Sequence, residues 1–91
     1  MILNLNNIYK RNVMFKCRNI YDTYIIDGNR RVFEINKTGY LIWGLLDGKR
    51  TVKQIIECLY NEYECELENL VKDISGFICI LEKNEFIILV K

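Results

Sequence analysis

The apolar residues between Glu66 and Lys83 recur with the period of an α-helix, and this segment constrains the fold more than any other. They are Leu67, Leu70, Val71, Ile74, Phe77, Ile78 and Leu81. Residues three and four positions apart share one face of a helix, so the spacing predicts an amphipathic helix whose apolar stripe packs on a core. Asn84 is expected to take the left-handed conformation that stops it. A chain of 91 residues is then one domain around this helix.

Two shorter helices are predicted before this segment. Asn36 is expected to cap the first helix, and Gly48 to end it in the left-handed conformation at the C′ position. Thr51 and Gln54 have the spacing of a capping box, which predicts the start of the second helix. The expected apolar stripe of that helix consists of Val52, Ile55, Ile56, Leu59, Tyr60 and Tyr63.

Short strands are predicted in the first third of the chain, at residues 13–21, 22–27 and 30–35, which mix β-branched and aromatic residues. Asp27-Gly28 separates the last two and marks a hairpin, because glycine adopts positive φ at no steric cost. Residues 86–90 predict a terminal strand or an extended cover. The expected fold is therefore α+β and winged-helix-like, a three-stranded antiparallel sheet followed by three helices in the order βββααα.

The third predicted strand is a candidate binding edge. Alternation places Arg31, Phe33 and Ile35 on one face, and Val32 and Glu34 on the other. At the edge of a sheet, its free N–H and C=O groups would form a template for another extended segment. The sequence alone leaves open whether this strand lies at an edge.

Composition excludes several function classes. The net charge is +1, there is no histidine, and the four cysteines form no CxxC pair, so neither a zinc site nor any other cofactor is expected. The carboxylates of residues 61–69 cluster at a helix start, where they favour the helix dipole, and no catalytic residues are predicted. The chain shows no signal peptide and no apolar run of membrane-helix length. A cytoplasmic location is expected, with no membrane partner.

A winged-helix nucleic-acid-binding regulator is the main alternative. The long helix, however, has a net charge of −2, from Glu66, Glu68, Asp73 and Glu82 against Lys72 and Lys83. A recognition helix with this charge repels phosphates, so nucleic acid is not the expected partner. A third alternative is a structural subdomain that docks a larger enzyme.

An ordered set of short motifs begins at the end of the third predicted strand. It consists of Ile35-Asn36-Lys37-Thr38-Gly39, Ile42-Trp43, Leu45-Leu46-Asp47-Gly48, Thr51-Val52, Ile55, Tyr63 and Phe77. In this order and spacing the motifs resemble the PqqD-like family of peptide chaperones, also called recognition elements for ribosomally synthesised and post-translationally modified peptides. The segment YIIDGNRRVFEIN is similar to the family's second and third strands, so the resemblance covers about residues 14–87. The chain departs from the family in having Asn84 where glycine is usual and Cys65-Glu66-Leu67 in place of Val-Asp-Pro.

The resemblance implies a non-catalytic binder that spans residues 1–91 as one domain. In the family, the leader of a precursor peptide adds as a strand beside the third strand and lies in a groove against the third helix. Carried over, the strand partners are Arg31, Val32, Phe33, Glu34 and Ile35, and the groove wall comes from Leu70, Lys72, Asp73, Ile74 and Phe77. Val32 and the stem of Arg31 are expected to flank apolar leader side chains, and Arg31 and Lys72 to pair with leader carboxylates.

The partners implied by the resemblance are the precursor leader peptide and a modifying enzyme, such as a radical-SAM protein, a leader protease or a cyclase. The chain is expected to be a monomer or a strand-swapped dimer. The precursor, the product class and the partner enzyme all remain open at this point.

Overall fold

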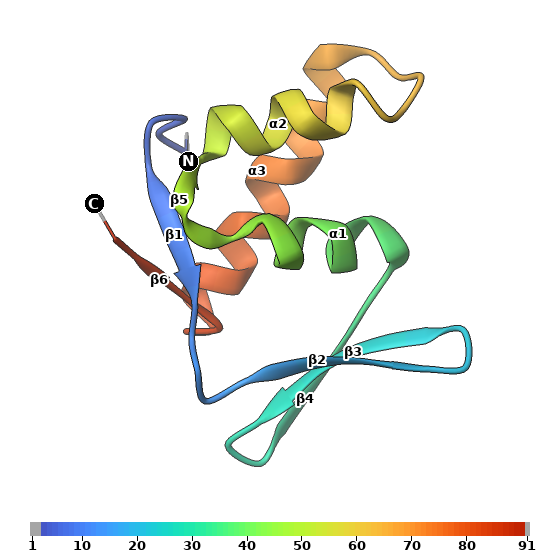
Figure 1. Cartoon of the computed structure of the whole chain (residues 1–91), viewed down its shortest axis with the longest axis vertical. Helices are drawn as coiled ribbons and strands as arrows, with labels where there is room; N and C mark the ends of the chain where they lie inside the picture. Colours follow the sequence, from blue (N-terminus) through green and yellow to red (C-terminus); the bar gives the residue numbers. More distant parts are fainter. Residues whose placement is uncertain (1–2, 91) are drawn as a thin grey trace.

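The computed structural model describes residues 3–90 and arranges them as two three-stranded sheets and three helices (Figure 1). In chain order the elements are β1 (Ile8–Arg11), β2 (Lys16–Ile20), β3 (Thr23–Gly28), β4 (Arg31–Ile35), α1 (Lys37–Leu45), β5 (Asp47–Thr51), α2 (Val52–Tyr60), α3 (Leu67–Lys83) and β6 (Ile87–Leu89). The predicted α+β class is confirmed, as are the antiparallel three-stranded sheet (β2-β3-β4) and the three helices that follow it. No helix among these residues is long and apolar enough to cross a membrane.

The hairpin between β3 and β4 forms where it was predicted, but its two loop residues follow the Asp27-Gly28 pair instead of including it. Gly28 pairs with Arg31, so the two loop residues are Asn29 and Arg30, whose φ angles of 49° and 64° are both left-handed. This is the geometry of a type I′ turn, whose twist matches that of the strands. Gly28 is required for a different reason: a Cβ there would lie 2.1 Å from the carbonyl oxygen of Met14.

The second sheet, in the order β5-β1-β6, adds two strands that the sequence did not predict. β1 and β5 are short and carry several charges, so they show no clear strand alternation. β5 also corrects the expectation for Gly48: α1 ends at Leu45 with Leu46 as its C-cap, and Gly48 lies within β5 rather than at C′. Its φ is nevertheless +80°, and Lys10 of the neighbouring strand packs against it. The terminal strand predicted within residues 86–90 is confirmed as β6.

Both predicted N-caps are confirmed. The backbone N–H of Gly39 donates to Oδ1 of Asn36 at 2.7 Å, and Thr51 and Gln54 form the reciprocal capping box. The predicted left-handed stop at Asn84 is wrong, because that residue has a φ of −91°. Glu85 takes the left-handed conformation instead, with a φ of 64°.

One core unites the helices and both sheets. The long-helix stripe is buried at Leu70, Ile74, Ile78 and Leu81, and Trp43 of α1 joins it at 6% exposure. Two residues expected in buried stripes, Tyr60 and Leu67, are instead exposed, because they lie near helix ends that project beyond the core. In Figure 1, α1 and α2 cross in front of α3, and the β2-β3-β4 sheet extends below them.

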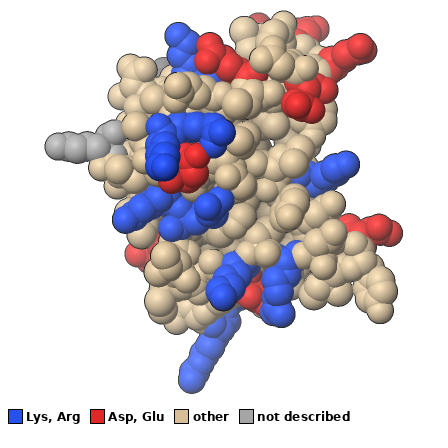
Figure 2. Space-filling view, viewed as in Figure 1, with Lys and Arg blue, Asp and Glu red and all other residues tan. Residues whose placement is uncertain are grey.

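Charge is unevenly distributed over the surface. Figure 2 shows Lys and Arg side chains gathered over the strands at the left and bottom of the molecule, and Asp and Glu side chains at the upper right, around the connection between α2 and α3. The strands β1, β2 and β5 together contribute Lys10, Arg11, Lys16, Arg18, Lys49 and Arg50. The connection and the start of α3 contribute Glu62, Glu64, Glu66 and Glu68.

Candidate functional site

β4 is an edge strand with one unpaired side. It pairs with β3 through its whole length, from Arg31 to Ile35, and with no other strand among residues 3–90. The alternation predicted from the sequence is present: Val32 and Glu34 are exposed, Arg31 and Phe33 are half-buried, and Ile35 is buried. The structure therefore leaves one row of β4 backbone groups without a strand partner in the described chain.

The hairpin geometry identifies which backbone groups these are. The residues that flank a two-residue loop exchange hydrogen bonds with each other, and such pairs then alternate along the ladder. Because Gly28 and Arg31 flank the loop, Arg31, Phe33 and Ile35 direct their N–H and C=O groups toward β3. Val32 and Glu34 direct theirs toward the open side.

One stripe of α3 runs beside this open side. Asp73, Phe77, Ile80 and Asn84 share a helix face, because they are spaced by four, three and four residues. Two contacts place the stripe along β4. A Cβ on Gly39 would lie 3.0 Å from Cζ of Phe77 and 3.2 Å from Cβ of Ile35, and the Asn84 end is bonded to Arg31.

A groove of about 400 Å³ opens at the Ile35 end of β4, between the N-terminus of α1, the connection between α2 and α3, and α3 itself. Its wall includes Leu70, Asp73, Ile74 and Phe77, four residues that the resemblance assigned to a groove wall. Leu70 and Ile74 are also core residues, at 7% and 1% exposure, so only Asp73 and Phe77 expose much surface to a guest.

The side chain of Arg31 is engaged within the chain. Its Nη1 donates to the carbonyl oxygen of Asn84 at 2.8 Å, and its Nη2 donates to Oδ1 of the same residue at 3.0 Å. The guanidinium carbon also lies 4.7 Å from the ring centroid of Phe86 and 5.7 Å from that of Phe15. These contacts join the start of β4 to the end of α3. They use two of the five N–H donors of the guanidinium that was expected to bind leader carboxylates.

Lys72, the second cation expected in the groove wall, lies on another face of α3. It lines a hollow of about 880 Å³ together with Leu3, Leu5 and other residues of the N-terminal segment and α3. The structure therefore does not bring Lys72 together with Asp73 and Phe77, although it neighbours Asp73 in sequence.

Ile80 is a candidate site residue that the sequence analysis missed. It is 46% exposed and lies between Phe77 and Asn84 on the stripe beside β4. The sequence did contain a signal for it. Ile80 follows Phe77 by three positions, which places both on one helix face, and that face is not the buried stripe of Leu70, Ile74, Ile78 and Leu81. An apolar residue displaced from the core stripe of a helix by one position marks a second apolar face.

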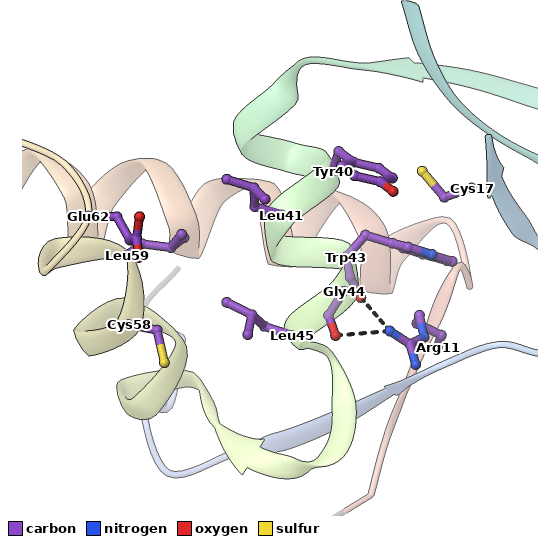
Figure 3. A pocket seen from close by; sticks show the side chains of 10 residues that line it. All are labelled: Arg11, Cys17, Tyr40, Leu41, Trp43, Gly44, Leu45, Cys58, Leu59 and Glu62. Carbon is purple, nitrogen blue, oxygen red and sulfur yellow. Dashed lines mark hydrogen bonds between the residues drawn. The ribbon is translucent and has the colours of Figure 1, made fainter. Parts of the chain in front are cut away.

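A further hollow of about 590 Å³ lies between α1 and α2 on the side shown in Figure 3. Leu41, Leu45 and Leu59 line it, and at one end Nη1 of Arg11 donates to the carbonyl oxygens of Trp43 and Gly44, both at 3.0 Å. These bonds satisfy carbonyl groups that the last turn of α1 leaves free. This hollow and the one at Lys72 are both larger than the groove, and this hollow also reaches Cys17 of the edge strand β2, so neither size nor an adjoining edge strand is enough to identify the site.

The described chain offers no metal-binding cluster: among residues 3–90, no three His, Cys, Asp or Glu side chains are placed to hold an ion. Its cysteines, Cys17, Cys58, Cys65 and Cys79, are all free thiols. Burial raises the pKa of the Cys17 thiol, which disfavours the reactive thiolate.

Comparison with solved structures finds the same fold in two proteins. One is TbiB1 in complex with the TbiA(beta) leader peptide, with a TM-score of 0.73 and 20% identity over 86% of this chain and 93% of that chain. The other is lasso peptide synthetase B1 complexed with the leader peptide, with a TM-score of 0.75 and 18% identity over 88% of this chain and 96% of that chain. No curated protein matches the sequence.

A family model decides the relationship that the motifs indicated. The model described as coenzyme PQQ synthesis protein D (PqqD) matches residues 22–87. The match begins before β3, includes β4 and all three helices, and ends at the start of β6. The open strand and the groove both lie inside it, and the chain belongs to the PqqD family.

Proposed function

We propose that this chain binds the leader segment of a ribosomally synthesised precursor peptide by β-strand addition and presents the precursor to a modifying enzyme. The observation that carries the proposal is the open side of β4. There the backbone groups of Val32 and Glu34 face outward beside the exposed stripe of α3. The strand offers hydrogen bonds that are independent of guest sequence, and the stripe offers side-chain contacts that select among guests.

Comparison with known proteins also supports the proposal. The chain belongs to the PqqD family, and the two solved proteins that share its fold were both determined with a leader peptide bound. A leader added beside β4 would lie between that strand and α3, where Phe77 and Ile80 provide apolar surface.

The energetics require both parts of the site. Each backbone hydrogen bond to Val32 or Glu34 contributes about 0.5–1.5 kcal/mol net, whereas ordering a flexible leader costs about 1–2 kcal/mol per residue. Backbone bonds alone therefore do not hold a leader of several residues. Apolar leader side chains packed against Phe77 and Ile80 supply the remainder, at about 25 cal/mol per Å² of buried apolar surface.

The chemistry in this proposal belongs to the partner enzyme, a radical-SAM protein, a leader protease or a cyclase, and the chain itself is non-catalytic. An enzyme that docks on the chain while the leader is bound meets the rest of the precursor at an effective concentration of about millimolar. The gain in rate comes from tethering and needs no catalytic group on this chain.

Duplex DNA is not the partner that the geometry favours. The helix that a winged-helix protein would place in the major groove is α3, which carries three acidic and two basic residues, a net charge of −1. The basic residues of the chain lie mainly on the strands β1, β2 and β5. The binding test below therefore includes duplex DNA as the competing ligand.

The test compares two proline variants of adjacent residues in β4. In Val32→Pro the lost N–H faces the open side, which an edge strand tolerates. We expect binding of a synthetic leader peptide from the neighbouring precursor gene to weaken by at least about 10-fold, with the free energy of unfolding lowered by about 1 kcal/mol or less. In the control, Phe33→Pro, the lost N–H faces β3, and we expect a loss of about 3 kcal/mol of stability.

Isothermal titration gives the leader affinities, and urea unfolding gives the stabilities. Leader affinity left unchanged by Val32→Pro would overturn strand addition at β4. Binding to duplex DNA with a steep dependence on salt, in place of leader binding, would favour the nucleic-acid alternative.

A further inference from the structure

We propose that the leader bound by this chain carries a lysine or arginine at the position that lies against Asp73 and Glu64. An apolar residue two positions away in the leader packs on Phe77. This inference rests on the proposed function and adds to it the chemical class of the peptide. It reverses the charge preference that Arg31 and Lys72 suggested in the sequence.

The groove is acidic and has no charge of the opposite sign in its wall. Asp73 of α3 and Glu64 of the connection between α2 and α3 both line it, and no lysine or arginine does. Both carboxylates are exposed, and neither takes part in an ion pair or a side-chain hydrogen bond within residues 3–90. The ion pairs found there join Arg18 to Asp27 and Arg50 to Asp47.

The two cations that were expected to pair with leader carboxylates do not line the groove. The guanidinium of Arg31 donates to Asn84 at the far end of the stripe, and Lys72 lines the hollow beside the N-terminal segment. An acidic leader residue at the Asp73 end would therefore meet like charge, which disfavours binding, whereas a basic one would complete two ion pairs.

The spacing of the stripe fixes where the basic residue lies in the guest. Asp73 and Phe77 are four residues apart, which is about 6 Å along a helix. Alternate residues of a strand face the same side and are about 6.6 Å apart. Consecutive guest side chains that face α3 can thus meet Phe77 and then Asp73. This spacing predicts an apolar residue, any residue, and then a basic residue, in either chain direction.

Affinity selection of random twelve-residue peptides by messenger-RNA display tests this inference with the purified full chain as bait. We expect the selected peptides to show lysine or arginine two positions from an apolar residue, enriched about 10-fold over aspartate and glutamate. The double variant Glu64→Gln/Asp73→Asn should lose the enrichment. The matched control, Glu57→Gln/Glu68→Gln, removes the same charge from residues that do not line the groove and should keep it.

The outcomes separate this inference from the function on which it rests. If the selected peptides lose binding to Val32→Pro and yet show no preference for basic residues, or prefer acidic ones, that result would overturn the inference and would still support strand addition. An enrichment that survives in Glu64→Gln/Asp73→Asn would also overturn it. The absence of any peptide whose binding depends on Val32 would count against the proposed function itself.

Discussion

Two edge strands of this molecule, β4 and β6, each have one side that is unpaired in the described chain, yet they differ in their surroundings. β4 spans five residues and faces the α3 stripe with Phe77 and Ile80. β6 spans three residues, and none of the hollows described above is lined by it. Under the proposed function, this difference means that an open ladder is not sufficient for recognition, and that a facing wall is also needed to select and anchor a guest.

The two sheets also divide stability from binding. In β5-β1-β6, Tyr9 and Ile87 are 1% and 2% exposed, and they anchor the sheet in the core. In β2-β3-β4, β2 is almost wholly exposed and the sheet enters the core mainly through Ile26 of β3 and Ile35 of β4. The sheet that contributes less to the core is the one to which we assign guest binding, because its exposed strands can meet a guest without opening the interior.

The largest expected effect tests the structural role of β6. Ile87→Ala removes a buried side chain at 2% exposure, and we expect a loss of about 2–5 kcal/mol in the free energy of unfolding. Leu89→Ala, in the same strand but 47% exposed, should cost less than about 1 kcal/mol. Urea unfolding measures both, and equal losses would contradict the division of roles within β6.

The next effect concerns the contact that joins the two sides of the site. Arg31→Gln removes the guanidinium that bonds Asn84 and lies over Phe86, and we expect a loss of about 1–3 kcal/mol in stability. Arg30→Gln, at the adjacent turn position, should be nearly neutral. The binding of an acidic leader should fall no more than that of a neutral one, since Arg31 does not face the guest. A selective loss of acidic leaders would restore the original expectation for Arg31.

A smaller effect is expected when Ile80, on the α3 stripe beside β4, is compared with Ile88 of β6. Ile80 and Ile88 are 46% and 43% exposed, so truncating either to alanine costs little stability. We expect Ile80→Ala to weaken leader binding by about 3–10-fold, from the apolar area lost to the guest, and Ile88→Ala to leave it unchanged. Titration calorimetry measures both, and equal effects would show that the guest does not distinguish the two edges.

The smallest effect lies in the β5 turn. Hydrogen bonds from the backbone N–H of Arg50, and secondarily of Lys49, hold the pKa of Asp47 below its ordinary value. A lowered carboxylate pKa stabilises the fold above the unfolded pKa of about 3.9, and that contribution disappears as the pH falls through the folded pKa. We expect Asp47→Asn to cost less than about 1 kcal/mol at pH 7, with the difference from the unmodified chain vanishing in acid. Asp22→Asn is the control, and a difference that grows toward low pH would contradict the assignment.

Helices were predictable from the sequence because their signals are local. The capping pair Thr51 and Gln54 and the long apolar period after Glu66 each lie within one element, and both helices begin within a residue of the prediction. The end of α2 was predicted less well, because the helix ends at Tyr60, three residues before the last residue of its expected stripe, Tyr63. The second sheet was not predictable in the same way. β1 and β5 are stabilised by pairing with segments far away in the sequence, so their charged residues hide the strand pattern.

The candidate site likewise combines features with a local sequence signal and features that depend on tertiary packing. The alternation of β4 and the place of Phe77 follow from spacing, but the orientation of Arg31 and Lys72 depends on what packs around them. Arg31 turns inward because the free carbonyl of Asn84 and the ring of Phe86 lie within its reach. Neither contact has a local signal, so a prediction based on charge assigned Arg31 to the guest.

Amide hydrogen exchange along β4, with and without the leader peptide, tests the central claim most directly. Without the leader, we expect the amides of Phe33 and Ile35 to be protected by β3 and those of Val32 and Glu34 to exchange fast. Addition of the leader should protect Val32 and Glu34 selectively, which gives an every-second-residue pattern. The amide of Leu89 in β6, which faces away from β1, should keep exchanging fast. New protection at Leu89, or fast exchange at Val32 and Glu34 while the leader is bound, would contradict strand addition at β4.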